Sequence, residues 1–223
     1  MNHQGKNMLE NMEKVQTRRE FLVNTAKVTA GAIAFGSVGS LLNVTSAFAD
    51  ETAAPEHPFK YAKLDPEKTK ELGYQNYFAK GGCGMGAFSA IIEQLTEAVG
   101  YPFNQIPVNL FANASAGYGA ASLCGSLGGA AGAIALVTPP ADAKTITADL
   151  FSWYRSHAFP EYQPEFQSAT TVADSVNCAD SLNNFMTATG LKMGDDGRKA
   201  RCASVTGETA AKAVELLNAY FGL

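Results

Sequence analysis

The sequence has little histidine, few cysteines and no excess of positive charge. Its 223 residues include three His and four Cys, and 17 Lys plus Arg stand against 21 Asp plus Glu, a formal net charge of -4. A basic surface that could release counterions from a nucleic acid is therefore missing, and we expect no nucleic-acid partner. Four cysteines are too few for a disulfide scaffold in a chain of this length, but they match one metal centre or two disulfides.

Long, strongly apolar runs are also missing, which excludes a protein built from several membrane spans. Residues 98–141 carry no charge, but Pro102 and Pro107 interrupt them. The stretch Ala120–Val137 is mostly Ala, Gly and Ser, which contribute little transfer free energy compared with Leu or Ile. It predicts a buried central helix that neighbouring helices approach closely. We expect no permanent membrane span in the mature protein.

The amino terminus has the features of an export signal. Residues 17–22 read Thr-Arg-Arg-Glu-Phe-Leu, a weakly apolar run follows from Val28 to Leu42, and Ala-Phe-Ala occupies residues 47–49. This pattern predicts a twin-arginine signal peptide over residues 1–49, cleaved after Ala49, and a periplasmic location. A permanent anchor helix is the alternative, but glycines dilute the run and it is shorter than about 20 strongly apolar residues.

Helical signals dominate the rest of the chain, after an extended leader expected over residues 50–63. Apolar residues recur at helical spacing between Pro, Gly and capping residues. The helices predicted in this way cover 65–79, 83–99, 120–137, 142–159, 178–190 and a last segment from Cys202 to Tyr220, with a surface loop at 160–176. No segment alternates long enough to predict a sheet. We therefore expect an all-α fold, with residues 64–223 forming one domain of about six helices around the Gly/Ala-rich helix.

The cysteines are the candidate functional residues: Cys83, Cys124, Cys178 and Cys202. The intervals between them contain 40, 53 and 23 residues, so no close C-x-x-C pair exists and only the fold could bring them together. Each is expected on the buried face of a helix. Cys83 and Cys178 fall near predicted helix N-termini, where the helix dipole stabilises a thiolate.

Three interpretations of the cysteines stay open on spacing alone. Four thiolates could bind an iron–sulfur cluster, which suits an exported redox carrier that folds around its cofactor before export. The same four sulfurs could bind zinc. Two disulfides could instead connect the helices in an oxidising compartment, which would make the protein a metal-free thiol–disulfide redox or disulfide-stapled binding module.

Several segments together resemble a known family. The residues are Gly-Gly-Cys-Gly-Met-Gly-Ala-Phe at 81–88, Leu-Cys-Gly at 123–125, Cys178, and Arg-Lys-Ala-Arg-Cys at 198–202. They resemble the redox-active family named for its C, GCAxxG, C, C pattern. The segments 64–77, 99–107 and 209–218 are more closely similar to the split-Soret cytochrome c branch of this family.

The resemblance implies an α-helical, dimeric, periplasmic electron-transfer protein with a redox partner protein, whose four cysteines bind an iron–sulfur centre as cofactor and metal ligands. Covalent haem c cannot be carried over, because the sequence contains no C-x-x-C-H. A non-covalent haem at a dimer interface is a further alternative. His57 and His157 would be its candidate axial ligands, although we expect both to be exposed. Cys124 is followed by Gly-Ser rather than Ala, a departure from the family pattern.

Overall fold

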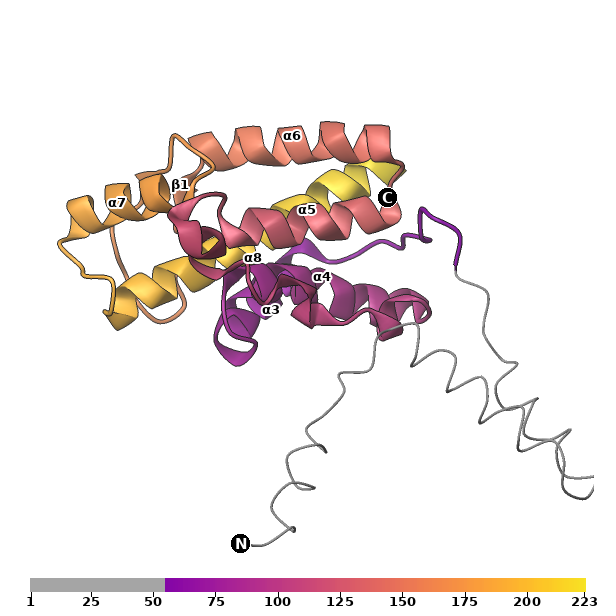
Figure 1. Cartoon of the computed structure of the whole chain (residues 1–223), viewed down its shortest axis with the longest axis horizontal. Helices are drawn as coiled ribbons and strands as arrows, with labels where there is room; N and C mark the ends of the chain where they lie inside the picture. Colours follow the sequence, from indigo (N-terminus) through magenta and orange to yellow (C-terminus); the bar gives the residue numbers. More distant parts are fainter. Residues whose placement is uncertain (1–54) are drawn as a thin grey trace, which may run out of the picture. The chain divides into compact units, whose positions relative to one another are not determined.

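The structure is a computed structural model that describes residues 55–223 (Figure 1). The predicted signal peptide lies outside the described residues. Six α-helices are present in the described part, which confirms the predicted all-α class. They are α3 (Pro66–Ala79), α4 (Cys83–Val99), α5 (Gly125–Val137), α6 (Pro140–Ser156), α7 (Cys178–Thr189) and α8 (Asp196–Phe221).

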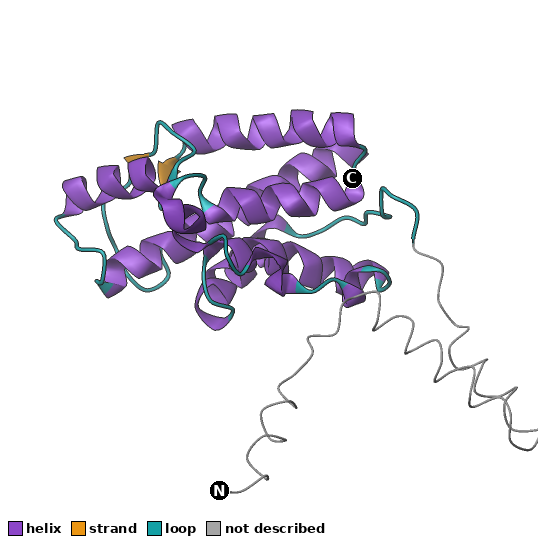
Figure 2. Cartoon of the chain, viewed as in Figure 1, coloured by secondary structure: helices purple, strands orange, loops and turns teal. Residues whose placement is uncertain are grey.

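Short elements fill the connections (Figure 2). Two 3-10 turns, η2 (Phe103–Gln105) and η3 (Val108–Phe111), follow α4, and a π-turn, η4 (Gly117–Ala121), precedes α5. The strands β1 (Ala158–Phe159) and β2 (Thr171–Val172) pair antiparallel. β2 lies in the segment expected to be a plain loop, but two residues are too few to show an alternating pattern in the sequence.

The boundaries of α3 and α4 confirm the sequence prediction. The Asp65 carboxylate accepts hydrogen bonds from the backbone N–H groups of Glu67 (2.9 Å) and Lys68 (3.3 Å), and Pro66 occupies the first helical position. Gly81 and Gly82 then adopt φ angles of 92° and 123°, which side-chain-bearing residues rarely accept, so the chain turns there and α4 begins at once.

Helix α8 is the central element of the packing. It contacts α3, α4, α5 and α6 and runs across the bundle from the end near α7 to the carboxyl terminus (Figure 1). Its crossing with α3 is very close, since a Cβ atom on Gly73 would lie 2.7 Å from the Cα of Gly207. Fully buried apolar side chains from five elements fill the space between the helices: Phe88, Ile91, Leu95, Leu127, Ile134, Leu150, Phe159 and Leu217.

The Gly/Ala-rich helix is buried as predicted, but its predicted start is wrong. Helix α5 begins at Gly125 rather than Ala120, because the preceding residues form a π-turn with left-handed backbone. Ala116, Tyr118 and Ala121 have φ angles of 53°, 59° and 54°. These residues cannot continue an α-helix, and Cys124 therefore flanks α5 instead of lying within it.

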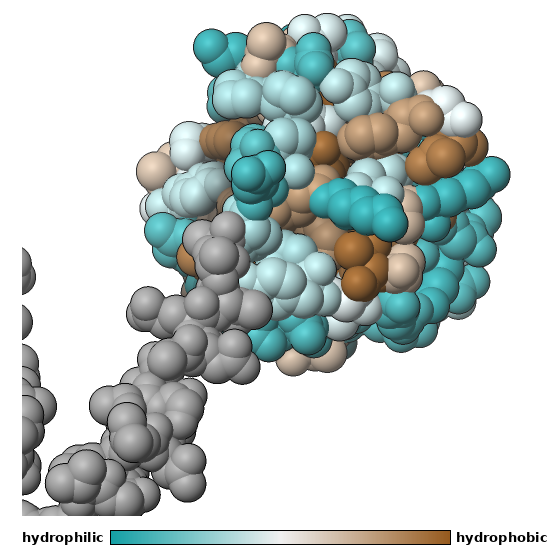
Figure 3. Space-filling view, turned by 90° about the vertical axis from the view of Figure 1, so that its right-hand side faces the viewer, coloured by the Kyte–Doolittle hydropathy of each residue, from teal (hydrophilic) through white to brown (hydrophobic). Residues whose placement is uncertain are grey.

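On the face of the described part shown in Figure 3, apolar residues gather in the middle and at the upper right, and polar residues surround them. No helix within residues 55–223 combines the length and the apolar character required to span a bilayer.

Candidate redox site

Three of the four cysteines stand at helix N-termini. Cys83 is the first residue of α4, Cys178 is the first residue of α7, and Cys124 immediately precedes α5. The prediction that Cys124 lies on a helix face is therefore wrong, while the positions predicted for Cys83 and Cys178 are confirmed. Cys202 lies in the second turn of α8. Because a helix N-terminus carries partial positive charge, three helix dipoles favour negative charge at this site.

A long-range backbone bridge connects Cys124 to Cys178. The N–H of Cys124 donates to the carbonyl of Val176 at 2.8 Å, and the N–H of Cys178 donates to the carbonyl of Ser122 at 2.6 Å. Leu123 and Asn177 lie opposite each other in this antiparallel bridge. Helices α5 and α7, whose cysteines are separated by 53 residues, thus both start beside this backbone bridge.

Cys83 and Cys124 are close enough for their side chains to share a hydrogen bond, with the Cys83 thiol as donor. A glycine makes this approach possible, since a Cβ atom on Gly125 would lie 2.6 Å from the Cys83 Sγ. The hydroxyl oxygen of Ser126 lies 3.0 Å from the Cys124 Sγ. All four cysteines are free thiols in the structure, so it contains neither of the two disulfides considered above.

The thiols influence one another's ionisation. The hydrogen bond from Cys83 lowers the pKa of Cys124 to about 5, against the effect of its burial. The same hydrogen bond, with burial and the charges of the other cysteines, raises the pKa of Cys83 well above its usual value. Burial and then the charge of Cys124 raise the pKa of Cys178 to about 11. The four sulfurs therefore cannot all ionise together unless a cation compensates them.

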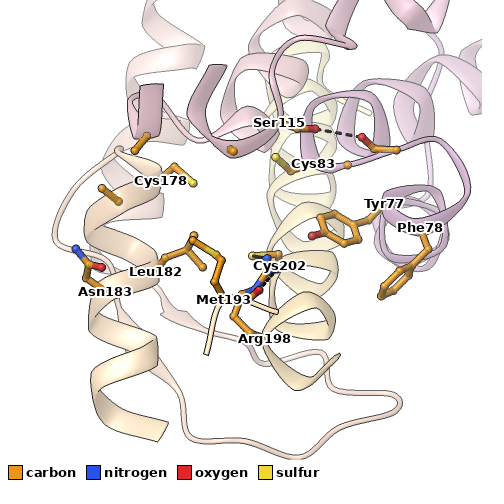
Figure 4. A pocket seen from close by; sticks show the side chains of 15 residues that line it. Tyr77, Phe78, Cys83, Ser115, Cys178, Leu182, Asn183, Met193, Arg198 and Cys202 are labelled. Atoms are coloured by element: carbon orange, nitrogen blue, oxygen red, sulfur yellow. Dashed lines mark hydrogen bonds between the residues drawn. The ribbon is translucent and has the colours of Figure 1, made fainter. Parts of the chain in front are cut away.

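A cavity of about 680 Å³ opens beside the thiols. Figure 4 shows Cys83, Cys178 and Cys202 on its walls, each from a different helix. Tyr77 and the half-exposed Phe78 line the α3 side, and apolar or small side chains line most of the rest. Cys124 is buried behind this wall, with 7% of its surface exposed. The cavity gives the cysteine site a route to solvent.

Arg198 reaches Cys202 from one helical turn earlier. Its Nη1 atom lies 3.8 Å from the Cys202 Sγ, and its Nε donates to the carbonyl of Met193 at 2.7 Å (Figure 4). Arg198 also hydrogen-bonds Tyr77. Arg198 and Cys202 are four residues apart, which places both side chains on one face of α8. The sequence contains this signal for a role of Arg198 at the site.

Arg201 is a second cation at the site, and it is buried. Only 3% of its surface is exposed, and its Nη2 donates to the Ser181 hydroxyl at 2.8 Å. Sequence reasoning gave it no role, because nothing in the spacing distinguishes a buried arginine from an exposed one. Its burial follows from the contacts of its side chain with Phe185 of α7 and Phe159 of β1.

The donor set suits a metal–sulfur centre more than a single-ion site. Among residues 55–223, no three or more His, Cys, Asp or Glu side chains converge as the ligands of one metal ion do. In a [4Fe–4S] cluster each cysteine binds a different iron atom, so the four sulfurs are spaced more widely than around one zinc ion. Four soft thiolate donors near an open cavity fit such a cluster.

The two histidines lie away from the cysteines. His57 is exposed, as expected, and its Nε2 lies 2.6 Å from the carbonyl oxygen of Ala135. The expectation that His157 is exposed is wrong, because its side chain is 16% exposed and lies 3.1 Å from the Glu208 carboxylate. It also stacks on Trp153, with ring centroids 4.5 Å apart. These contacts hold His157 in a structural network on another side of α8.

The profile of the family described as "Putative redox-active protein (C_GCAxxG_C_C)" matches residues 86–216, and this chain belongs to that family. Three of the four cysteines lie inside the matched range, and Cys83 lies three residues before it. The chain is also similar to split-Soret cytochrome c of Desulfovibrio desulfuricans, with 31% identity over 172 residues. This match covers 72% of the chain and only 61% of that protein.

A solved structure of split-Soret cytochrome c from Desulfovibrio desulfuricans ATCC 27774, described as having a novel iron centre, has a similar fold. The TM-score is 0.71 at 29% identity, and the match covers 74% of this chain and 72% of that chain. The family and this relative confirm the resemblance found in the sequence and support a redox role for the chain.

Proposed function

We propose that this protein is an exported electron-transfer protein that binds an iron–sulfur cluster through Cys83, Cys124, Cys178 and Cys202. The observation that carries the proposal is the approach of four free cysteines to one region, where Cys83, Cys178 and Cys202 line one cavity and Cys124 is buried beside Cys83. The iron centre described for the split-Soret relative supports an iron cofactor. An iron–sulfur cluster would accept and return single electrons at this site.

The surroundings of the cysteines are suited to a net-negative group. Three helix N-termini place positive dipole ends at Cys83, Cys124 and Cys178, and Arg198 reaches Cys202. Tyr77 and the neighbouring apolar side chains form the cavity wall beside the cysteines. Burial opposes the addition of an electron, while nearby positive charge favours it, so these groups would set the reduction potential.

The first experiment is anaerobic purification of residues 50–223 from a host that builds clusters, followed by iron and acid-labile sulfide analysis and an absorption spectrum. We expect iron and sulfide in matching amounts. Each single Cys→Ser variant should lose most of the iron, whereas Ser115→Ala, which changes a hydroxyl in the cavity wall, should retain it. Full iron content in all four Cys→Ser variants would show that the ligand set is wrong.

A metal-free thiol–disulfide protein is the second candidate, favoured by the contact between Cys83 and Cys124. Thiol counting on denatured protein separates the two functions. Four free thiols after removal of the metal support the cluster. A colourless protein that contains no iron and has fewer than four thiols would support reversible pairing of cysteines instead.

The location and assembly are part of the same proposal. The twin-arginine pattern of residues 17–22 supports export to the periplasm, and the proposal includes a homodimer and a redox partner protein, which the family resemblance of the sequence implies. Replacement of Arg18 and Arg19 by Lys should retain the protein in the cytoplasm, as measured by cell fractionation. Unchanged export would contradict the twin-arginine route. Size-exclusion chromatography with light scattering tests the dimer.

A further inference from the structure

Arg201 is a buried cation for which the described part of the chain provides no carboxylate partner. Within residues 55–223 no ion pair includes Arg201, and its Nε atom has no hydrogen-bond partner. The guanidinium carbon lies 5.3 Å from the ring centroid of Phe185 and 6.0 Å from that of Phe159. Aromatic faces stabilise a cation by less than the desolvation of an unpaired charge costs. An anion is therefore needed nearby.

The structure places the cysteine site on the side where that anion is needed. Arg201 donates to Ser181, which lies one helical turn after Cys178 on α7. Ser181 also accepts a hydrogen bond from the Tyr154 hydroxyl at 3.3 Å, and the charge of Cys124 acts on Tyr154. Through Ser181 and Tyr154, Arg201 is thus linked with the region of Cys178 and Cys124.

We propose that Arg201 is the charge-compensating residue of the metal centre, and that it stabilises the reduced state more than the oxidised state. This inference rests on the proposed function. Arg201 does not ligate the metal but is a positioning residue, which acts through Ser181 and Tyr154 and through its charge. Because an added electron increases the negative charge at the sulfurs, a fixed buried cation favours reduction.

Arg201 differs from Arg198 in how strongly solvent weakens its charge. Arg198 lines the open cavity, is partly exposed and shares its donors with the Met193 carbonyl. Arg201 is buried among Phe159 and Phe185, where the effective dielectric constant is lower. We therefore expect the charge of Arg201 to have the larger effect on the reduction potential.

The test compares Arg201→Met and Arg201→Lys with wild type in the cluster-loaded protein. The matched control is Lys199→Met, which removes the same charge from the same turn of α8, where Lys199 is exposed and pairs with Asp196 at 2.8 Å. Redox titration should show that Arg201→Met disfavours the reduced form at least about tenfold, which is about 59 mV for a one-electron couple. Arg201→Lys should keep most of the wild-type value, and Lys199→Met should change it by less than about twofold.

A second measurement uses the same variants without metal. Because the centre would add negative charge beyond that of the Cys124 thiolate, Arg201→Met should destabilise the metal-free protein to urea much less than it destabilises the cluster-loaded protein. With the cluster bound, the same variant should be less stable than wild type. A purely structural role of Arg201 would destabilise both forms equally.

The outcomes separate the two proposals. Absence of any iron–sulfur centre in the wild type overturns both. A centre in the wild type with an unchanged potential in Arg201→Met, or equal destabilisation of the loaded and metal-free forms, overturns the role of Arg201 and leaves the proposed function intact. A shift that Lys199→Met reproduces also overturns it, because the effect would then belong to net charge.

Discussion

The crossing of α3 with α8 and the cysteine site use the backbone in opposite ways. At the crossing, Gly73 and Gly207 bring two helices so close that no side chain separates them. At the cysteine site, three helices begin beside sulfur atoms and leave a cavity of about 680 Å³. The first region gains stability from dense packing. The cysteine site is less densely packed, and it provides a cavity lined by the positive ends of helices.

The helix starts differ in the same way. Helix α3 is capped by the Asp65 carboxylate, whereas no side chain makes a capping hydrogen bond at Gly82 before α4 or at Asn177 before α7. The first N–H groups of a helix have no partner within the helix. At α3 a protein side chain satisfies some of them, and at the cysteine helices they remain available to an anionic group.

The largest expected effect is at the crossing. Gly207→Val would place a side chain against the carbonyl of Lys70, so we expect a loss of about 3 kcal/mol in the free energy of unfolding, measured by urea denaturation. Gly194→Val is the matched control, because nothing lies within 4 Å of a Cβ atom there. Equal effects of the two substitutions would show that the close approach does not contribute to stability.

A smaller effect should follow removal of the proposed metal centre, and it should be confined to the cysteine site. We expect backbone hydrogen exchange in α7 and in residues 116–124 to increase at least about tenfold, which is about 1.4 kcal/mol of local stability. These segments contribute few of the fully buried side chains. The central turns of α4 and α5 should be unchanged. Uniform acceleration over all helices would mean that the two regions unfold together.

The smallest effect concerns the caps. Asp65→Ala removes two hydrogen bonds to the first turn of α3, and we expect it to destabilise the protein by about 1 kcal/mol. Asn177→Ala occupies the corresponding position of α7, where the side chain makes no capping bond, and it should cost less than about 0.5 kcal/mol. Thermal unfolding of both variants measures the difference. Equal losses would contradict the contrast between the two helix starts.

Much of the fold could be predicted because the residues that begin and end its helices act over short distances in the chain. Asp65-Pro66 and Gly81-Gly82 bound α3 and start α4 through backbone preferences that act within a few residues. The start of α5 was mispredicted because the left-handed turn before it depends on distant pairing. Backbone hydrogen bonds between the segment before Cys124 and the segment before Cys178 hold that turn. The residue preferences of either segment alone do not indicate this pairing.

The candidate site was predictable only in part. The four cysteines followed from their number and their family pattern, and the structure brings them to one region. The burial of Arg201 and the contact of His157 with Glu208 were not predictable. Both depend on which face of α8 meets α7 or the loop after β1, and that choice is made by side-chain packing across the whole domain.

By itself, the sequence determined the all-α class, most helix boundaries and the four sulfur-bearing residues, because helix propensity, capping and glycine or proline punctuation act over short distances. Only the tertiary structure decided that Cys124 also stands at a helix N-terminus, that three of the cysteines line one cavity, and that one of two nearby arginines is buried. Convergence and burial arise from contacts between residues far apart in the chain. The electrostatics of the site therefore depend on the tertiary structure, whereas its cysteines can be identified from the sequence.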